Sequence, residues 1–149
     1  MESLLAGWDR DTPEGAHDLA IGLCLARLGL RASEVAGLML EDVNWQQATV
    51  CLERSQSGAR APLPLLAEVG EAMAQYLRQG RPSCAYRQVF LFHQPARPMT
   101  SQAVSAVIRR GLRRCGIEVR RAGAHLLRHC HASASSGRGH HRHCAMAWA

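Results

Sequence analysis

Three side chains of this sequence have types and spacings that suit chemistry on a phosphate group: Arg31, His125 and Arg128. Arg31 lies in the stretch GLRASE, where one predicted helix ends at a glycine and the next begins. His125 and Arg128 lie in the stretch HLLRH, and a spacing of three residues places them one helical turn apart on one face. Guanidinium groups bind phosphate oxygens through paired hydrogen bonds, and histidine is the commonest general acid or base. These residues indicate a phosphate-containing partner, whereas the reaction does not follow from them alone.

The charge distribution points to the same kind of partner. All 18 basic residues are arginine, and the net charge is +6. Residues 1–75 carry 5 arginines against 11 acidic residues, whereas residues 76–149 carry 13 arginines against one acidic residue, Glu118. A GC-rich genome would explain the missing lysines but not this segregation. The basic half therefore favours a polyanion such as nucleic acid.

Length and composition indicate one globular domain. The chain has 149 residues, of which 47% are hydrophobic, and no apolar run long enough to span a membrane. We expect no signal peptide, and six cysteines without a CxxC pair favour unbridged thiols in the reducing cytoplasm.

The hydrophobic pattern predicts a mainly helical α+β domain with a small antiparallel sheet. Thr12 and Pro13 are a helix-start signal, and Thr100 is a predicted N-cap. The predicted helices are 14–29, 31–40, 66–80, 100–116 and one that begins at 123; the predicted strands are 42–45, 48–54, 60–66 and 88–92.

Two of these elements carry further arginines. The strands 48–54 and 60–66 form a hairpin with Arg54 and Arg60 at its base. Helix 100–116 turns Val104, Ile108 and Cys115 inward and exposes a basic edge of Arg109, Arg110, Arg113 and Arg114. We select Arg54, Arg60, Arg109, Arg110 and Arg113 as candidate DNA-binding residues.

In order and spacing, these motifs resemble the catalytic domain of the tyrosine recombinases, the phage-integrase family. The resemblance covers about residues 14–134, with GLRASE as the first motif, ERSQSGARAPLPL as the hairpin and HLLRH as the second motif. It implies the catalytic core of the DNA breaking-rejoining enzymes, which exchange phosphodiesters through a phosphotyrosine without metal or nucleotide cofactor. It also implies double-stranded DNA as the partner, with full-length recombinase subunits as further candidates, and no membrane or small-molecule substrate.

The resemblance also implies roles for single residues. Arg31 and Arg128 would clamp the non-bridging phosphate oxygens, where negative charge gathers in the transition state. His125 would hydrogen-bond the phosphate or help to take the tyrosine proton. Glu34 lies one helical turn after Arg31, and it either orients that guanidinium or is an ordinary helix-start carboxylate.

The sequence departs from the family pattern in two places. The hairpin has Arg54 where the family carries a lysine that protonates the leaving oxygen, and arginine is a poor proton donor. No tyrosine follows Arg128, and the two tyrosines of the chain, Tyr76 and Tyr86, lie far upstream and are expected to be structural. We therefore expect this chain not to cleave DNA alone.

The end of the sequence, GHHRHCAMAWA, has neither helical nor strand periodicity. As a zinc site it would offer His140, His141, His143 and Cys144, but zinc sites usually draw ligands from two separated segments, and we predict no metal. Read one base later, the tail can encode an amphipathic helix that runs into the family's Leu-Gly-His motif. Our hypothesis is a frameshift between about Ala132 and Gly139, followed by early termination; the alternative is deliberate truncation with the tail as a disordered arm on DNA. The nucleotide sequence of the gene distinguishes the two.

These features predict a DNA-binding fragment of a site-specific recombinase that lacks its last helices. We expect a partial catalytic domain over residues 1–137 and a disordered tail over 138–149, without the helical core-binding domain that precedes the catalytic domain in the family. A non-catalytic DNA-binding regulator of a recombination site is the main alternative, and a metal-binding protein is a third class.

Overall fold

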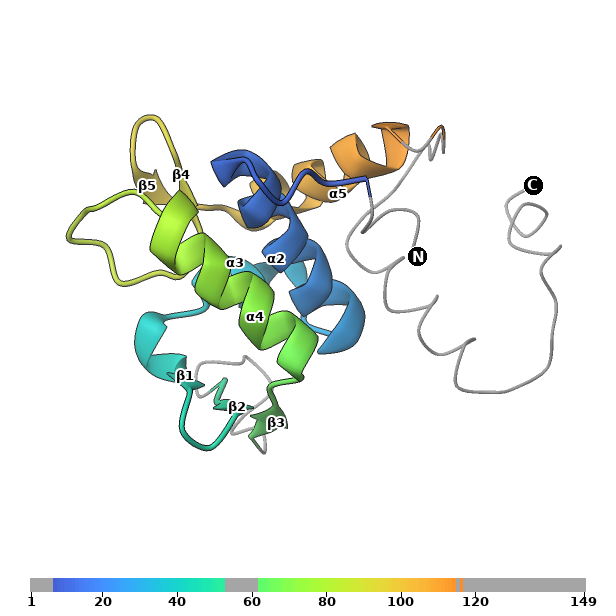
Figure 1. Cartoon of the computed structure of the whole chain (residues 1–149). Helices are drawn as coiled ribbons and strands as arrows, with labels where there is room; N and C mark the ends of the chain where they lie inside the picture. Colours follow the sequence, from blue (N-terminus) through green and yellow to red (C-terminus); the bar gives the residue numbers. More distant parts are fainter. Residues whose placement is uncertain (1–6, 53–61, 115, 117–149) are drawn as a thin grey trace, which may run out of the picture.

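Helices dominate the described part of the chain, which also contains two small antiparallel sheets (Figure 1). The computed structural model of the chain describes residues 7–52, 62–114 and 116. The described elements are, in chain order, α2 (Pro13–Arg27), α3 (Ala32–Gly37), the short helix η1 (Leu40–Asp42), β1 (Val43–Asn44), β2 (Thr49–Val50), β3 (Leu63–Pro64), α4 (Ala67–Gln75), η2 (Tyr76–Gly80), β4 (Leu91–Phe92), β5 (Arg97–Pro98) and α5 (Ser101–Arg114). This architecture confirms the predicted mainly helical α+β class.

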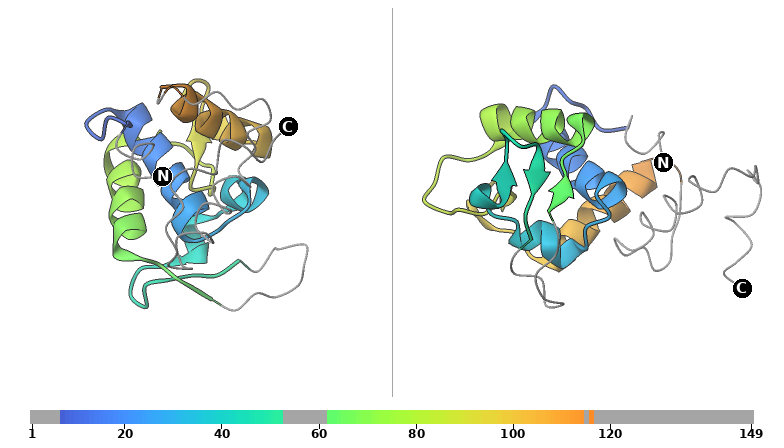
Figure 2. Two further views of the ribbon diagram at one scale, coloured as in Figure 1. Left: turned by 90° about the vertical axis from the view of Figure 1, so that its right-hand side faces the viewer. Right: turned by 90° about the horizontal axis from the view of Figure 1, so that it is seen from below.

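Helix α2 is the centre of the core. It packs against α3, α4, η2 and α5, and its residues from Gly15 to Ala26 are all buried. Figures 1 and 2 show it between α4 on one side and α5 on the other. A helix that is apolar around its whole circumference is stable only when it is enclosed in this way. None of the helices in the described part of the chain is long and apolar enough to cross a membrane.

The ends of the long helices follow the predicted capping signals. Thr12 is the N-cap of α2, where its Oγ1 accepts a hydrogen bond from the backbone N–H of Gly15 at 3.1 Å, and Pro13 opens the helix. Thr100 caps α5 in the same way through the N–H of Ala103 at 3.2 Å. Gly29 and Gly116 follow these helices with positive φ angles of 65° and 72°, a conformation that glycine adopts without strain.

The predicted second helix, 31–40, is wrong in its last part. Helix α3 ends at Gly37, and the chain then runs extended through Leu38 into η1. The backbone of this segment pairs with another part of the chain: the Leu38 carbonyl accepts from Val89 at 2.8 Å, and Leu40 donates to the Arg87 carbonyl at 2.9 Å. These bonds replace the helical ones, so long-range pairing overrides local periodicity here.

The three-stranded sheet has the order β1-β2-β3, with Val43 opposite Val50 and Thr49 opposite Pro64 (Figure 2). The predicted strands 42–45, 48–54 and 60–66 correspond to β1, β2 and β3, which are shorter than expected. A second sheet pairs β4 with β5, and β5 was not predicted. Its residues, Arg97 and Pro98, carry no alternating pattern, and proline lacks the N–H that a central strand needs.

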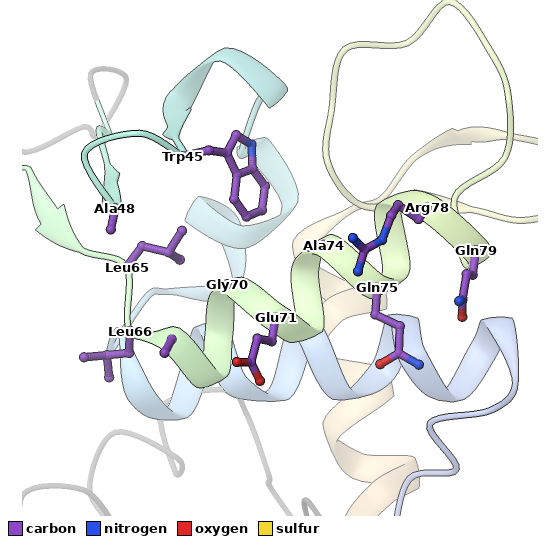
Figure 3. A pocket seen from close by; sticks show the side chains of 11 residues that line it. Trp45, Ala48, Leu65, Leu66, Gly70, Glu71, Ala74, Gln75, Arg78 and Gln79 are labelled. Carbon is purple, nitrogen blue, oxygen red and sulfur yellow. The ribbon is translucent and has the colours of Figure 1, made fainter.

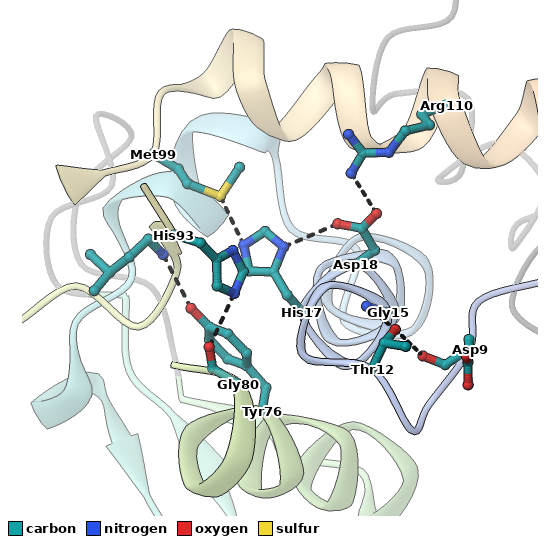
Figure 4. A network of polar contacts seen from close by, with 11 residues as sticks. Asp9, Thr12, Gly15, His17, Asp18, Tyr76, Gly80, His93, Met99 and Arg110 are labelled. Atoms are coloured by element: carbon teal, nitrogen blue, oxygen red, sulfur yellow. Dashed lines mark hydrogen bonds and ion pairs between the residues drawn. The ribbon is translucent and has the colours of Figure 1, made fainter. Parts of the chain in front are cut away.

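Substitution of Gly15 by alanine is expected to destabilise the fold by about 2 kcal/mol, because a Cβ at this position would overlap the backbone carbonyl of Asp9 (Figure 4). The segment that carries the Thr12 cap would have to move. Gly37→Ala is the matched control, since no heavy atom lies within 4 Å of its ideal Cβ position. Urea unfolding of both variants measures the difference, and equal stabilities would contradict the expectation.

Candidate nucleic-acid interface

Arg31 lies at the corner where α2 passes into α3. Gly29 turns the chain, Leu30 is buried, and Arg31 then takes the N-cap position of α3. Its backbone N–H donates to Glu34 Oε2 at 2.7 Å, and its carbonyl accepts from Val35 at 2.9 Å. The backbone is thus fixed on both sides, whereas the side chain is 53% exposed and extends to the surface.

The Glu34 carboxylate contacts both the backbone and the guanidinium of Arg31, so it both caps helix α3 and lies beside the side chain that it could orient. Its Oε2 atom caps the helix through the backbone of Arg31 at 2.7 Å. Its Oε1 atom lies 3.9 Å from the Arg31 guanidinium, which is a long ion pair. Helix capping is therefore the stronger of the two contacts.

The exposed edge of α5 carries Arg109, Arg110, Arg113 and Arg114, and α5 packs against α3, the helix that Arg31 begins. Val104 and Ile108 are buried on the opposite side of α5, as predicted. Within the described ranges, Arg109, Arg113 and Arg114 form no ion pair. Like charges at positions 109 and 113 repel each other along a helix. The edge is therefore a surface that an anionic partner would stabilise.

Arg110 differs from its neighbours because it binds Asp18, a carboxylate of the central helix (Figure 4). The Arg110 Nη2 to Asp18 Oδ2 distance is 2.6 Å, and the other carboxylate oxygen lies 3.0 Å from His17 Nδ1. Burial by itself raises the pKa of Asp18, but the hydrogen bonds from His17 and Arg110 outweigh it and hold the pKa below the ordinary value of 3.8.

The network around Asp18 was not predicted from the sequence. His17 and Asp18 are the two polar residues in the middle of the otherwise apolar helix α2, and both are buried. Buried charges are normally paired, so this interruption of the apolar pattern was a signal that could have been used. The partner, Arg110, lies 92 residues away along the chain and could not have been named from the pattern.

Tyr76 is buried in the core and is not placed to act as a nucleophile. Its ring stacks on Phe90 with centroids 5.6 Å apart, and its hydroxyl accepts a hydrogen bond from the N–H of Leu91 at 3.3 Å. Burial raises the pKa of Tyr76 to about 12. The predicted structural role of this tyrosine is confirmed, whereas Tyr86 is 45% exposed in the loop before β4.

Four of the predicted site residues lie outside the described residues: Arg54, Arg60, His125 and Arg128. The convergence of Arg31 with His125 and Arg128 therefore stays a prediction. The histidines of the tail, as candidate metal ligands, also lie outside the described part.

A shallow groove on the other side of the molecule is separate from this arginine surface. It runs between Trp45 and α4, with Leu65 and Leu66 as its apolar lining and Glu71 and Arg78 at its rim (Figure 3). Its lining residues include no His, Cys or Ser side chain, and Glu71 is the one carboxylate among them, so the groove lacks a metal ligand set.

Comparison with known protein families matches residues 1–141 to the phage integrase family. The chain belongs to this family. Membership confirms the resemblance that the arginine motifs carry, and it identifies the fold as a tyrosine recombinase catalytic domain.

Individual proteins similar to this chain carry names from the same family. The y4rA protein of Sinorhizobium fredii, described by its name as an integrase/recombinase, is 46% identical over 135 residues, which cover 89% of this chain and 32% of the relative. The crystal structure of the XerA recombinase superposes with a TM-score of 0.74 at 20% identity, and the structure of the Tn1549 transposon integrase with circular intermediate DNA superposes with 0.70 at 19%. These two matches cover 90% and 93% of this chain but 47% and 51% of the solved chains. The integrase-family chain thus spans a third to a half of the length of these relatives.

Proposed function

We propose that this chain contacts double-stranded DNA as part of a site-specific tyrosine recombinase, with the exposed edge of α5 lying along the phosphate backbone. The observation that carries the proposal is the exposed edge of α5, on which Arg109, Arg113 and Arg114 form no ion pair within the described residues, in a chain that belongs to the phage integrase family. The Tn1549 integrase, which shares this fold, is itself in complex with DNA. Arginine rows of this kind neutralise backbone phosphates and release condensed counterions.

The second part of the proposal is a phosphate cradle formed by Arg31, His125 and Arg128. Two permanently charged guanidinium groups would stabilise the negative charge that develops on the non-bridging oxygens during phosphodiester exchange. The geometry of Arg31 supports this role, since its backbone is held from both sides while its side chain is exposed. His125 would donate to the phosphate or accept a proton during the reaction.

The hairpin arginines Arg54 and Arg60 belong to the same proposed surface, with Arg54 at the position of the family's lysine. We place the activity in the cytoplasm, with full-length recombinase subunits as candidate protein partners. Residues 1–137 are proposed to form the partial catalytic domain and residues 138–149 to be a separate tail.

The double variant Arg109→Ala/Arg113→Ala is expected to weaken binding to a labelled duplex about ten- to hundredfold at 0.1 M salt, because two phosphate contacts are lost. The slope of log affinity against log salt concentration should become less steep by about 2, one for each contact. Fluorescence anisotropy at several salt concentrations measures both quantities.

Arg78→Ala is the matched control, because Arg78 is also exposed but lies in η2, across α2 from α5. It should leave the affinity within about twofold of the wild-type value. The proposal fails if the wild-type chain shows no salt-dependent binding, or if the Arg78 variant loses as much affinity as the double variant.

A further inference from the structure

One arginine of the α5 edge, Arg110, is held in place from the interior of the protein. Its side chain is 53% exposed, yet its Nη2 atom lies 2.6 Å from an oxygen of Asp18, whose side chain is only 3% exposed. An arginine at the surface usually samples many rotamers. Arg110 instead has one end of its guanidinium fixed to a buried carboxylate (Figure 4).

The buried carboxylate is itself immobilised. Asp18 Oδ1 accepts from His17 Nδ1 at 3.0 Å, so this nitrogen carries a proton. The His17 ring packs in turn against Met99 Sδ, 3.2 Å from Nε2, and against the ring of Tyr76, with centroids 5.1 Å apart. A continuous series of contacts therefore runs from the aromatic core through His17 and Asp18 to the surface guanidinium.

This fixed arginine still has donors to offer. A guanidinium carries five N–H donors in a rigid plane, and the contact with Asp18 engages only one terminal nitrogen. The exposed remainder of the group can bind a phosphate oxygen while the inner edge stays on the carboxylate. Because the side chain is already ordered, binding does not lose its rotamer entropy, which favours a fixed arginine over a free one by about two- to tenfold in affinity.

We infer that Asp18 is a positioning residue for DNA binding, which orients the Arg110 guanidinium toward one backbone phosphate. The inference rests on the proposed function, since it requires DNA to lie along α5. It makes an unusual prediction about charge. Removal of an acidic residue ordinarily strengthens binding to DNA, because the net charge becomes more positive. Removal of the Asp18 carboxylate is expected to weaken binding instead.

The first test compares two substitutions that keep the charge, Arg110→Lys and Arg109→Lys. Lysine cannot hold a carboxylate and a phosphate through one rigid plane, so Arg110→Lys should weaken duplex binding by about five- to tenfold. Arg109 has no ion pair within the described residues and needs only its charge, so Arg109→Lys should lose less affinity than Arg110→Lys. Equal effects of the two substitutions would overturn the inference.

The second test is a cycle of Asp18→Asn, Arg110→Ala and the double variant, measured by anisotropy at temperatures where circular dichroism shows each variant folded. Asp18→Asn should weaken binding by about two- to tenfold in the wild-type background and have no effect in the Arg110→Ala background. If Asp18 is merely structural, Asp18→Asn should lower the DNA affinity equally in both backgrounds. If Asp18→Asn binds DNA more tightly than the wild type, the carboxylate only repels DNA. Either result overturns the inference, and if Asp18→Asn does not fold, the two lysine variants decide alone.

The proposed function fails separately from this inference. If the double variant Arg109→Ala/Arg113→Ala binds DNA as tightly as the wild type, the proposed DNA surface itself is refuted. If that double variant loses affinity while Asp18→Asn and Arg110→Lys behave like the wild type, then α5 binds DNA without the contribution of Asp18.

Discussion

Substitution of Asp18 by alanine is expected to lower the free energy of unfolding by about 3 kcal/mol at neutral pH, because one partner of a buried charged network is removed. His17 would be left buried with an unsatisfied Nδ1–H, and α5 would lose its polar contact with the central helix. Urea unfolding measures the loss. Asp11→Ala is the matched control, since Asp11 is exposed and its change should stay within about 0.5 kcal/mol.

The pH dependence of the same residue provides an independent check. Since the folded-state pKa of Asp18 lies below 3.8, its ionised form stabilises the fold above that pH, and this stabilisation is lost as the pH falls below 3.8. The wild-type protein and Asp18→Asn should therefore converge in stability at acidic pH. A constant difference between them from pH 7 to the acid transition would contradict the assigned charge state.

Much of the helical framework could be predicted because local signals define it. Thr12 with Pro13, and Thr100, begin α2 and α5, and a glycine with positive φ follows each of these helices. These signals act within one turn of the chain, so they are readable without tertiary structure. The end of helix α3 at Gly37 and the strand β5 could not be predicted from the sequence, because both depend on backbone pairing with other segments.

The candidate site shows the same division. Arg31 and the arginines of α5 were selected from motif and helical face, and the structure places them at the surface on neighbouring elements. The role of Asp18 could not be foreseen, since it depends on a partner in another part of the sequence. Only the presence of a charge within an apolar helix marked the position in advance.

The structure also changes the meaning of the charge segregation. Several arginines of the basic half already contact other parts of the protein: Arg87 pairs with Glu41, Arg81 donates to the carbonyls of Tyr86 and Gln88, and Arg97 lies over the ring of Phe92. Glu41, like Asp18 at Arg110, is an acidic residue of the first half that neutralises an arginine of the second half. The number of phosphates that the chain contacts should consequently be smaller than its count of arginines, and the salt dependence correspondingly weaker.

Two buried acids predict a steep loss of stability at alkaline pH. Burial raises the pKa of Cys24 from 9.0 to about 12 and that of Tyr76 from 10.0 to about 12. As the pH rises above 9, the unfolded chain loses these protons while the folded chain still retains them. The contribution of the two groups to the free energy of unfolding is therefore fully present below pH 9 and falls as the pH rises. Between its unfolded-state and its folded-state pKa, each group lowers the free energy of unfolding by about 1.4 kcal/mol per pH unit. By pH 12 the loss amounts to about 4 kcal/mol for Cys24 and about 3 kcal/mol for Tyr76. We expect the thermal midpoint to be level up to pH 9 and to fall steeply above it.

Variants assign the alkaline loss to these two groups. Cys24→Ser keeps the size of the side chain but removes the thiol, so the decline should begin near pH 10 instead of pH 9. Tyr76→Phe should remove the second component, at the expense of the hydrogen bond from Leu91. Cys51→Ser, at the end of the three-stranded sheet, leaves both buried groups in place and should retain the full decline. If the wild type and Cys24→Ser lose stability over the same pH range, the thiol is not protected by the fold, and the close packing of α2 in the core would need to be revised.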